Sequence, residues 1–446
     1  MRGDMTTLSL PTLYTCPGEK HPISRSVHLS RLAAFYPKCR DCQHRDDTGN
    51  LPQQTVERLQ STERRVERPS LFTDDGVRGV YLNELNRNRA GQMAGAFANL
   101  LWENFLRQGR AGTSSQQVRT RPSRHPRPVV VVGYDARPSS PDITTGVVTS
   151  LRRMGCHVVD INLTTRPCFC FSVDHLNATA GILVTGAGRE PSWTGLDFVG
   201  RHAEPFSVGS GLENIEATFL QGFSRPTRHA GPHRVFQATL PYEAGLWKHF
   251  HALRPLRIVC GCPIRLVRET LAKIFDKLPC RLQFVDIANR ARDFSNPEDQ
   301  DIKQVAQAVR DSSAHFGVVI DDDGCRCAFI DNHGQLMESR SVTILIAESL
   351  LTEQTLVEFA IDAAAVDVKP VIETLGGRIR DMGATLSSAY HALQNNNCIF
   401  AGGKRGHFWF RESAATCDAV LTLARMLQVM SQSDAQASEL IGRLAA

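Results

Sequence analysis

From Leu71 to about residue 430, the sequence alternates short apolar runs with stretches whose apolar residues recur at helical spacing. VVVVGYD (129–135), GILVTGA (181–187) and FGVVIDDDG (316–324) are three such runs, and each is typical of a buried strand. Strands that alternate with helices favour an α/β fold with a largely parallel sheet. We therefore predict three consecutive α/β domains with mixed, mostly parallel sheets.

Breaks in this alternation divide the 446 residues into segments, and the length suits two to four domains. A polar stretch near residues 203–235 separates the first cycle of strands and helices from the second, and a third cycle starts near Ser339. The predicted segments are a cysteine-containing head (1–50), a polar linker with some helical character (51–69), three α/β domains (70–215, 236–337 and 338–432) and a C-terminal tail (433–446).

The composition excludes global disorder and a membrane bundle, because 42% of the residues are hydrophobic and 22% are charged. No apolar run reaches the roughly 18 residues of a membrane helix, and the N-terminus lacks the pattern of a secretory signal. We expect a cytoplasmic protein with no membrane partner. Most of the 13 cysteines stand singly in apolar segments, which indicates reduced, buried thiols.

The net charge of +5 is concentrated between residues 107 and 128, which hold six arginines and no acidic residue. The same stretch is rich in Gly, Ser, Gln and Pro, so it is predicted to be a solvated loop. A nucleic-acid-binding arm is the alternative. No aromatic residues are interleaved for base stacking, and nucleic acid is therefore not the expected partner.

The head contains a C-x-x-C pair, with another cysteine and a histidine upstream. Thiolate and imidazole at such spacing suit tetrahedral Zn²⁺, and a closed four-ligand site would be structural. A redox dithiol and the absence of any site are the alternatives. A zinc-ribbon-like head of this length would depend on its metal to fold and could recruit a protein partner. The preferred ligands are Cys16, His21, Cys39 and Cys42, with His28 and His44 as substitutes for the histidine.

Five motifs follow one another between residues 70 and 430: GVRG (76–79), VVGYDARPSSP (131–141), GILVTGAGREPSWTGLDFVG (181–200), IDDDGCR (320–326) and CIFAGGKRGHFWF (398–410). In this order they resemble the phosphohexomutase family, which includes phosphoglucomutases, phosphomannomutases and phosphoglucosamine mutases. This resemblance implies three phosphohexomutase-like α/β domains and a phosphoserine that exchanges phosphoryl groups with a sugar phosphate with the help of Mg²⁺. It also places Arg78 and Arg326 at catalytic positions.

The position of the family's serine is occupied by Ala187, and alanine can neither carry nor transfer a phosphoryl group. The neighbouring hydroxyls belong to Thr185, Ser192 and Thr194, and they lie off the motif position. In the metal loop, the resemblance gives Asp321 and Asp323 the first two ligand positions and Cys325 the third. Because a thiol is a poor ligand for Mg²⁺, we expect either a weakened magnesium site or a hydrated turn.

In the sugar-binding loop, Gly403 stands in place of a glutamate and Arg405 in place of a serine, while Gly406 and His407 remain. Lys404 and Arg405 offer cationic donors that suit a phosphate or a carboxylate, or form a solvated pair on a loop tip. Asp197 occupies a position where lysine is usual. After residue 430 we find no counterpart of the family's fourth domain, whose loop grips the substrate's second phosphate.

These changes together predict a phosphoglucomutase/phosphomannomutase-family protein of carbohydrate metabolism whose catalysis is impaired. Its expected ligand is a sugar phosphate or another small anion. One alternative is an active or altered phosphotransferase that uses a different hydroxyl. The other is a protein-interaction scaffold in which the zinc head recruits the partner.

Overall fold

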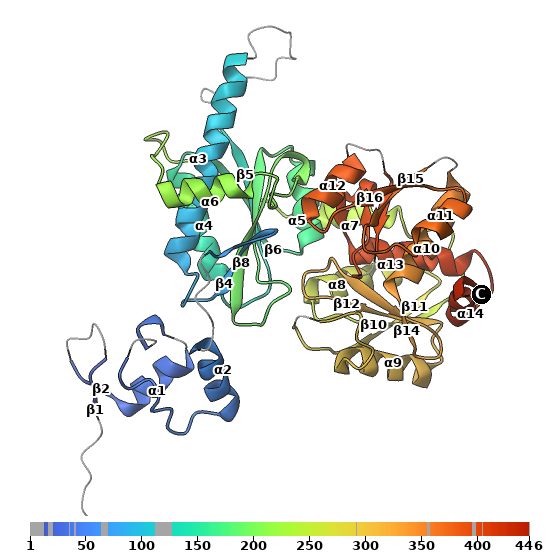
Figure 1. Ribbon diagram of the computed structural model, residues 1–446, viewed down its shortest axis with the longest axis horizontal. Coiled ribbons are helices and arrows are strands. Elements are labelled where there is room, and N and C mark those ends of the chain that lie inside the picture. Colours follow the sequence, from blue (N-terminus) through green and yellow to red (C-terminus); the bar gives the residue numbers. More distant parts are fainter. Residues whose placement is uncertain are drawn as a thin grey trace, which may run out of the picture. The chain divides into compact units, whose positions relative to one another are not determined.

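The computed structural model describes residues 13–16, 21–34, 36–39, 42–63, 70–111, 127–290, 292–354, 357–394, 398–403 and 405–445. The chain forms two compact units (Figure 1). The head unit comprises Met1–Leu71 and Gly79–Asn86, and the body unit comprises Phe72–Arg78 and Arg87–Ala446. Among the described residues, no helix has the length and apolarity that spanning a bilayer requires.

The head unit is built from a short hairpin, two helices and turns. Its strands β1 (Leu13–Tyr14) and β2 (Ile23–Ser24) pair antiparallel. Helix α1 (Arg25–Ala33) follows at once, and the Ser24 hydroxyl caps it by accepting a hydrogen bond from the Val27 N–H. Helix α2 (Gln53–Glu63) lies within the predicted polar linker, which is thus helical over these residues.

The first domain of the body unit contains a mixed seven-stranded sheet in the order β3-β4-β8-β7-β5-β6-β9. Strand β5 runs parallel to its neighbours β6 and β7, and β8 returns antiparallel to the central strand β7. Its strands are β3 (Phe72–Thr73), β4 (Gly76–Val80), β5 (Val129–Tyr134), β6 (His157–Leu163), β7 (Ala180–Val184), β8 (Trp193–Val199) and β9 (His233–Val235), and its helices are α3 (Arg87–Ala111), α4 (Ser140–Arg153), α5 (Arg166–His175) and α6 (Leu212–Gln221).

The second and third domains share one topology, in which the first strand lies between the second and the third, and the third is the central strand of five. In each, two parallel pairings are followed by two antiparallel ones. The strands are β10 (Arg257–Gly261), β11 (Arg281–Val285), β12 (Phe316–Ile320), β13 (Cys327–Ile330) and β14 (Leu336–Met337) in the second domain, and β15 (Glu358–Asp362), β16 (Arg378–Met382), β17 (Phe400–Gly402), β18 (Trp409–Phe410) and β19 (Thr416–Cys417) in the third.

The helices of these two domains bury apolar stripes against the sheets. In α9, Ile302, Val305 and Val309 are buried, which is the spacing of one helix face. The segment predicted to be a tail holds a helix, α14, that contacts α10. The helices are α7 (Thr239–Trp247), α8 (Arg265–Phe275), α9 (Gln300–Ser312), α10 (Ser339–Glu353), α11 (Lys369–Thr374), α12 (Leu386–Gln394), α13 (Ala419–Ser431) and α14 (Ala437–Ala445).

This topology decides where a site can form. In α/β sheets, loops that follow the carboxyl ends of parallel strands gather at one edge and carry ligand-binding residues. The loops that begin at Thr185 after β7, at Asp321 after β12 and at Gly403 after β17 are of this kind. They are also the loops that carry three of the five motifs.

Candidate functional site

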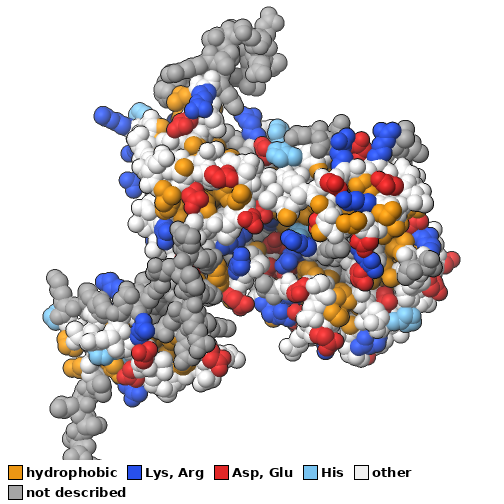
Figure 2. Space-filling view, in the orientation of Figure 1, with side chains coloured by type: hydrophobic (Ala, Val, Ile, Leu, Met, Phe, Trp, Pro, Cys, Tyr) orange, Lys and Arg blue, Asp and Glu red, His pale blue; other side chains and the backbone are white. Residues whose placement is uncertain are grey.

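A pocket of about 360 Å³ lies in the body unit, and loops of all three domains line it. Figure 2 shows acidic and basic side chains around a hollow on this unit. The structure brings seven of the predicted site residues together in its wall: Arg78, Ala187, Asp323, Cys325, Arg326, Arg405 and His407. Asp321 and Gly406 are close in sequence to these residues but do not line the pocket, and Lys404 lies outside the described residues.

A buried carboxylate between two arginines forms one wall. Arg78 Nη1 donates to Asp197 Oδ1 at 2.6 Å, and Arg166 Nη1 donates to Asp197 Oδ2. The side chains of Arg78, Arg166 and Asp197 are only 13%, 9% and 4% exposed. Two cations and one anion give this group a net charge of +1. In the family, the resemblance places a lysine at position 197; here the positive charge of that region comes from Arg78 and Arg166.

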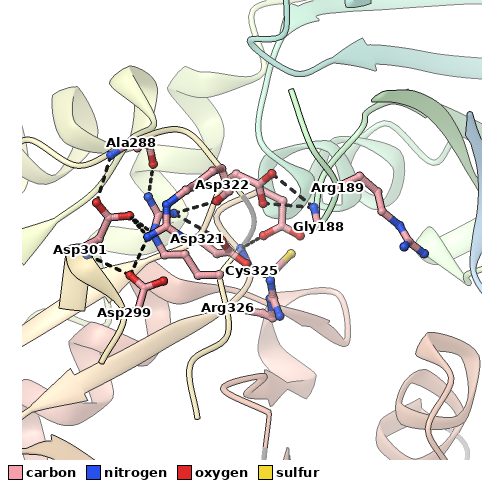
Figure 3. Close-up of polar contacts among 12 residues, drawn as sticks. Gly188, Arg189, Ala288, Asp299, Asp301, Asp321, Asp322, Cys325 and Arg326 are labelled. Carbon is pink, nitrogen blue, oxygen red and sulfur yellow. Dashed lines mark hydrogen bonds and ion pairs between the residues drawn. The ribbon is translucent and has the colours of Figure 1, made fainter. Parts of the chain in front are cut away.

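The first acidic residue of the former metal loop is also bound by arginines. Arg326 Nη2 pairs with Asp321 Oδ2, and Arg292 Nη1 lies 3.5 Å from Asp321 Oδ1. The Arg292 side chain is fully buried, and its Nε donates to Asp301 at 3.0 Å. Figure 3 shows Asp321 facing this arginine cluster, on the side away from Gly188.

Asp322, the second acidic residue of the metal loop, forms hydrogen bonds to the loop that contains Ala187. Asp322 accepts a hydrogen bond from Arg137 Nη2 at 2.8 Å. It also accepts one from the Gly188 N–H at 3.3 Å (Figure 3). Arg137 Nη1 also donates to the carbonyl of Glu190 at 2.8 Å. The position of the missing serine is therefore held in place by buried polar contacts although it carries no hydroxyl.

Burial raises the pKa of Asp322 to about 7, and Asp321 and Asp323 add to this effect, while Arg137 opposes it. The folded protein therefore holds this proton more tightly than the unfolded chain does. The contribution to stability is full below the ordinary pKa of 3.8 and is lost as the pH rises through about 7.

We therefore expect the free energy of unfolding of the wild type minus that of Asp322→Asn to decrease as the pH rises from about 4 to about 8. Urea denaturation at several pH values measures it. Asp286→Asn, at an exposed carboxylate, serves as the control and is expected to follow the wild type. Equal pH slopes for the wild type and Asp322→Asn would contradict the assignment.

The resemblance implies Mg²⁺ in this loop, and the three carboxylates of Asp321, Asp322 and Asp323 do lie within 4.8 Å of one another. The donors do not fit that ion, however. The carboxylates of Asp321 and Asp322 are already paired with arginines. At the third ligand position of the family, this chain has the thiol of Cys325 in place of a carboxylate. Arginine side chains supply positive charge to these carboxylates, as the metal would, so we derive no step through Mg²⁺.

The Cys325 thiol is buried in the pocket wall and hydrogen-bonded with Cys417. Burial, together with this hydrogen bond, raises its pKa well above the ordinary value. A neutral thiol is a weak ligand for a hard cation, because the thiolate is the form that binds metals. The structure thus supplies a second reason why this position does not replace a carboxylate.

The loop after β17 presents one cation and one neutral imidazole to the pocket. Arg405 is exposed at the wall, and His407 stacks on Trp409 with ring centroids 5.2 Å apart. Loss of hydration lowers the pKa of His407 to about 3, and repulsion from Arg326 contributes. His407 is therefore neutral near pH 7 and is suited to a hydrogen bond with a hydroxyl group.

Gly403 has no room for a side chain. A Cβ at this position would lie 2.5 Å from the Cβ of Asp362, which is closer than two such atoms approach in proteins. The glutamate that the resemblance places here therefore cannot be accommodated beside Asp362.

Three arginines of the site were not predicted from the sequence. Arg166 and Arg292 line the pocket, and Arg137 holds the loop beside it. Arg137 stands within a motif and Arg166 directly follows strand β6, which are signals that could have found them. Nothing in the sequence near Arg292 marks it. Of the hydroxyl residues named as neighbours of Ala187, Thr185 alone is among the described lining residues.

Three α/β domains whose strand-end loops meet at one pocket define a multidomain α/β protein with its ligand site at the carboxyl ends of its strands. The family model "Phosphoglucomutase/phosphomannomutase, alpha/beta/alpha domain I" matches residues 69–225. A phosphoglucomutase/phosphomannomutase of Thermococcus kodakarensis is 25% identical over 390 residues, covering 84% of this chain and 80% of the relative.

A phosphoglucosamine mutase of Frankia alni is likewise 25% identical, covering 83% of this chain and 80% of the relative. Among solved structures, a phosphoglucomutase/phosphomannomutase family protein of Burkholderia thailandensis has the same fold, with a TM-score of 0.71 at 21% identity. It covers 84% of this chain and 79% of that one. The family model, these relatives and the shared fold support the view that the chain is a member of the phosphohexomutase family.

Proposed function

We propose that the protein binds a sugar phosphate or a similar phosphorylated small molecule in this pocket and does not transfer the phosphoryl group. The observation that carries the proposal is the chemistry of the lining. Five arginines face the pocket, while the position that should supply the oxygen nucleophile is Ala187. Arginine is suited to phosphate because its planar guanidinium can donate two hydrogen bonds at once.

The arrangement of charges supports phosphate recognition without a metal. Arg78 and Arg166 share one carboxylate, which leaves a net positive wall, and Arg405 adds a cation on an exposed loop. The neutral His407 and the carboxylate of Asp362 offer hydrogen-bonding groups to sugar hydroxyls. A ligand with one anionic end and one hydroxyl-rich end matches this division.

Isothermal titration calorimetry with glucose 6-phosphate and mannose 1-phosphate tests the proposal. We expect binding in the presence of EDTA, and no binding of glucose or mannose alone, because the arginines act on the phosphate. Equal affinity for phosphorylated and free hexoses, or binding that requires Mg²⁺, would contradict it.

Arg405→Ala is expected to weaken this binding about tenfold, because a hydrogen bond to a charged group contributes about 1.5–3 kcal/mol. Titration of the variant with the same ligands measures the loss. Arg153→Ala removes an equally exposed arginine from α4, outside the pocket, and is the matched control that should bind as the wild type does. The same affinity in both variants would show that Arg405 does not contribute to binding of the ligand.

A further inference from the structure

The head unit contains three buried cysteines, and the sulfur atoms of two of them are in contact. Cys16 follows β1, Cys39 ends a short 3-10 turn (Pro37–Cys39), and Cys42 lies three residues further on. The sulfur atoms of Cys16 and Cys42 are 4.0 Å apart, and all three cysteines are free thiols. Cys39 lies close enough to both that negative charge on either one would raise its pKa, in addition to the larger effect of burial.

We propose that the head unit binds one structural Zn²⁺ through the sulfurs of Cys16, Cys39 and Cys42 and a nitrogen of His21. In a tetrahedral site with Zn–S bonds of about 2.3 Å, two sulfurs are about 3.8 Å apart. The observed separation between Cys16 and Cys42 is close to that value without a metal-induced adjustment.

The hairpin register favours His21 as the histidine. Leu13 pairs with Ser24 and Tyr14 pairs with Ile23, and the same register, extended two residues beyond the observed pairs, would set Cys16 opposite His21. Residues opposite each other in an antiparallel pair have Cβ atoms about 4.5–5.5 Å apart and point to the same face. That face is the one on which Tyr14 and Ile23 pack with Cys16 and Cys42.

The other two histidines of the head each have one ring nitrogen engaged. His28 Nε2 lies 3.0 Å from the Asp47 carbonyl and its ring stacks on Tyr14 at 4.2 Å, while its buried Nδ1 has no hydrogen-bond partner. His44 Nε2 lies 3.1 Å from Gln43 Nε2. His21 is exposed, and its ring is not engaged in a stacking contact among the head residues that the structure describes.

The charge around the thiols suits a zinc–thiolate centre. Zn²⁺ with three thiolates and a neutral imidazole carries a net charge of −1. Arg31 of α1 is hydrogen-bonded with Cys16, and its charge lowers the pKa of Cys16 and Cys39 against the effect of burial. A positive charge beside a centre of net charge −1 is electrostatically favourable.

The small core of the head gives such a metal a role in folding. Its apolar cluster consists of Tyr14, Cys16 and Cys42, with Ile23 partly buried against them. A core of this size contributes little stability, and small domains of this kind commonly depend on a metal.

Metal analysis of the reduced full-length protein tests the proposal. After exposure to Zn²⁺ and removal of loosely bound ions, we expect one zinc per chain in the wild type and in Cys280→Ser, which removes a buried thiol of the body unit. The double variant Cys39→Ser/Cys42→Ser should hold none. An absence of bound zinc in the wild type, or full retention in the double variant, would overturn the proposal.

Cobalt substitution keeps the test decisive if the double variant does not fold. Co²⁺ in a site of three thiolates and one imidazole shows thiolate-to-metal charge transfer and the intense visible bands of a tetrahedral ion, which we expect in the wild type. Bands of an octahedral ion would overturn the site. His21→Ala should alter this spectrum and His44→Ala should not; the reverse result would overturn the assignment of His21.

Discussion

Replacing Asp197 with asparagine is expected to lower the free energy of unfolding by about 3–5 kcal/mol, the usual result of removing one partner from a buried ion pair. The substitution leaves Arg78 and Arg166 close together with no counter-ion, and both side chains are largely buried. Urea denaturation followed by tryptophan fluorescence measures the loss, because Trp193 is buried on the strand β8 that also carries Asp197.

Two comparisons separate charge removal from a general effect of the substitution. Asp286→Asn removes a carboxylate that is 88% exposed and paired with Arg268, so its cost should stay below about 1 kcal/mol. In the background of Arg166→Met, which removes one of the two cations, Asp197→Asn should cost less than it does in the wild type. Equal costs in both backgrounds would show that the two residues are not coupled.

No phosphoryl transfer is expected when the protein is given glucose 1-phosphate, glucose 1,6-bisphosphate and Mg²⁺. The rate should lie below that of an active phosphohexomutase by a factor on the order of 10⁴ or more, because the nucleophile position is alanine, one metal-ligand position is a thiol and Asp321 is paired with Arg326. A coupled assay for glucose 6-phosphate measures turnover. Phosphopeptide mass spectrometry of residues 182–197 detects any phosphorylated hydroxyl, including that of Thr185.

Restoring the serine alone should not restore activity. Ala187→Ser supplies the oxygen, but Asp321 remains paired with Arg326 and the third ligand position remains the thiol of Cys325. Turnover by the wild type that disappears in Asp323→Ala would contradict the proposed function and favour an active phosphotransferase. Turnover by Ala187→Ser alone would instead show that the arginines replace the metal in catalysis.

The strand and helix alternation predicted most of the fold because its strongest signals are local. The run at 129–135 corresponds to β5, and the run at 316–324 contains β12. The two-residue strands β14 and β18 carry no periodic signal, because such a strand is too short for one. Helix α14 is amphipathic, yet we read its residues as a tail because the resemblance ended before it.

The motifs predicted the positions around the pocket better than the contacts within it. Ala187, Cys325 and His407 line one pocket, as residues at corresponding motif positions should. The partners of the arginines could not be predicted in this way. Arg137 meets Asp322 across 185 residues of sequence, and Arg78 meets Asp197 across 119, so only the folded chain brings the charges together.

The crowding of Gly403 by Asp362 also constrains how this protein can evolve. A single substitution that restores glutamate at position 403 would force its Cβ against Asp362, so the first step back toward the family's sugar-binding loop is a structural defect. Because the Cβ of Asp362 makes this contact, and every residue except glycine has a Cβ, alanine at position 362 would not relieve it. A variant that carries a side chain at position 403 therefore needs glycine at position 362, or a shift of the backbone between the two loops.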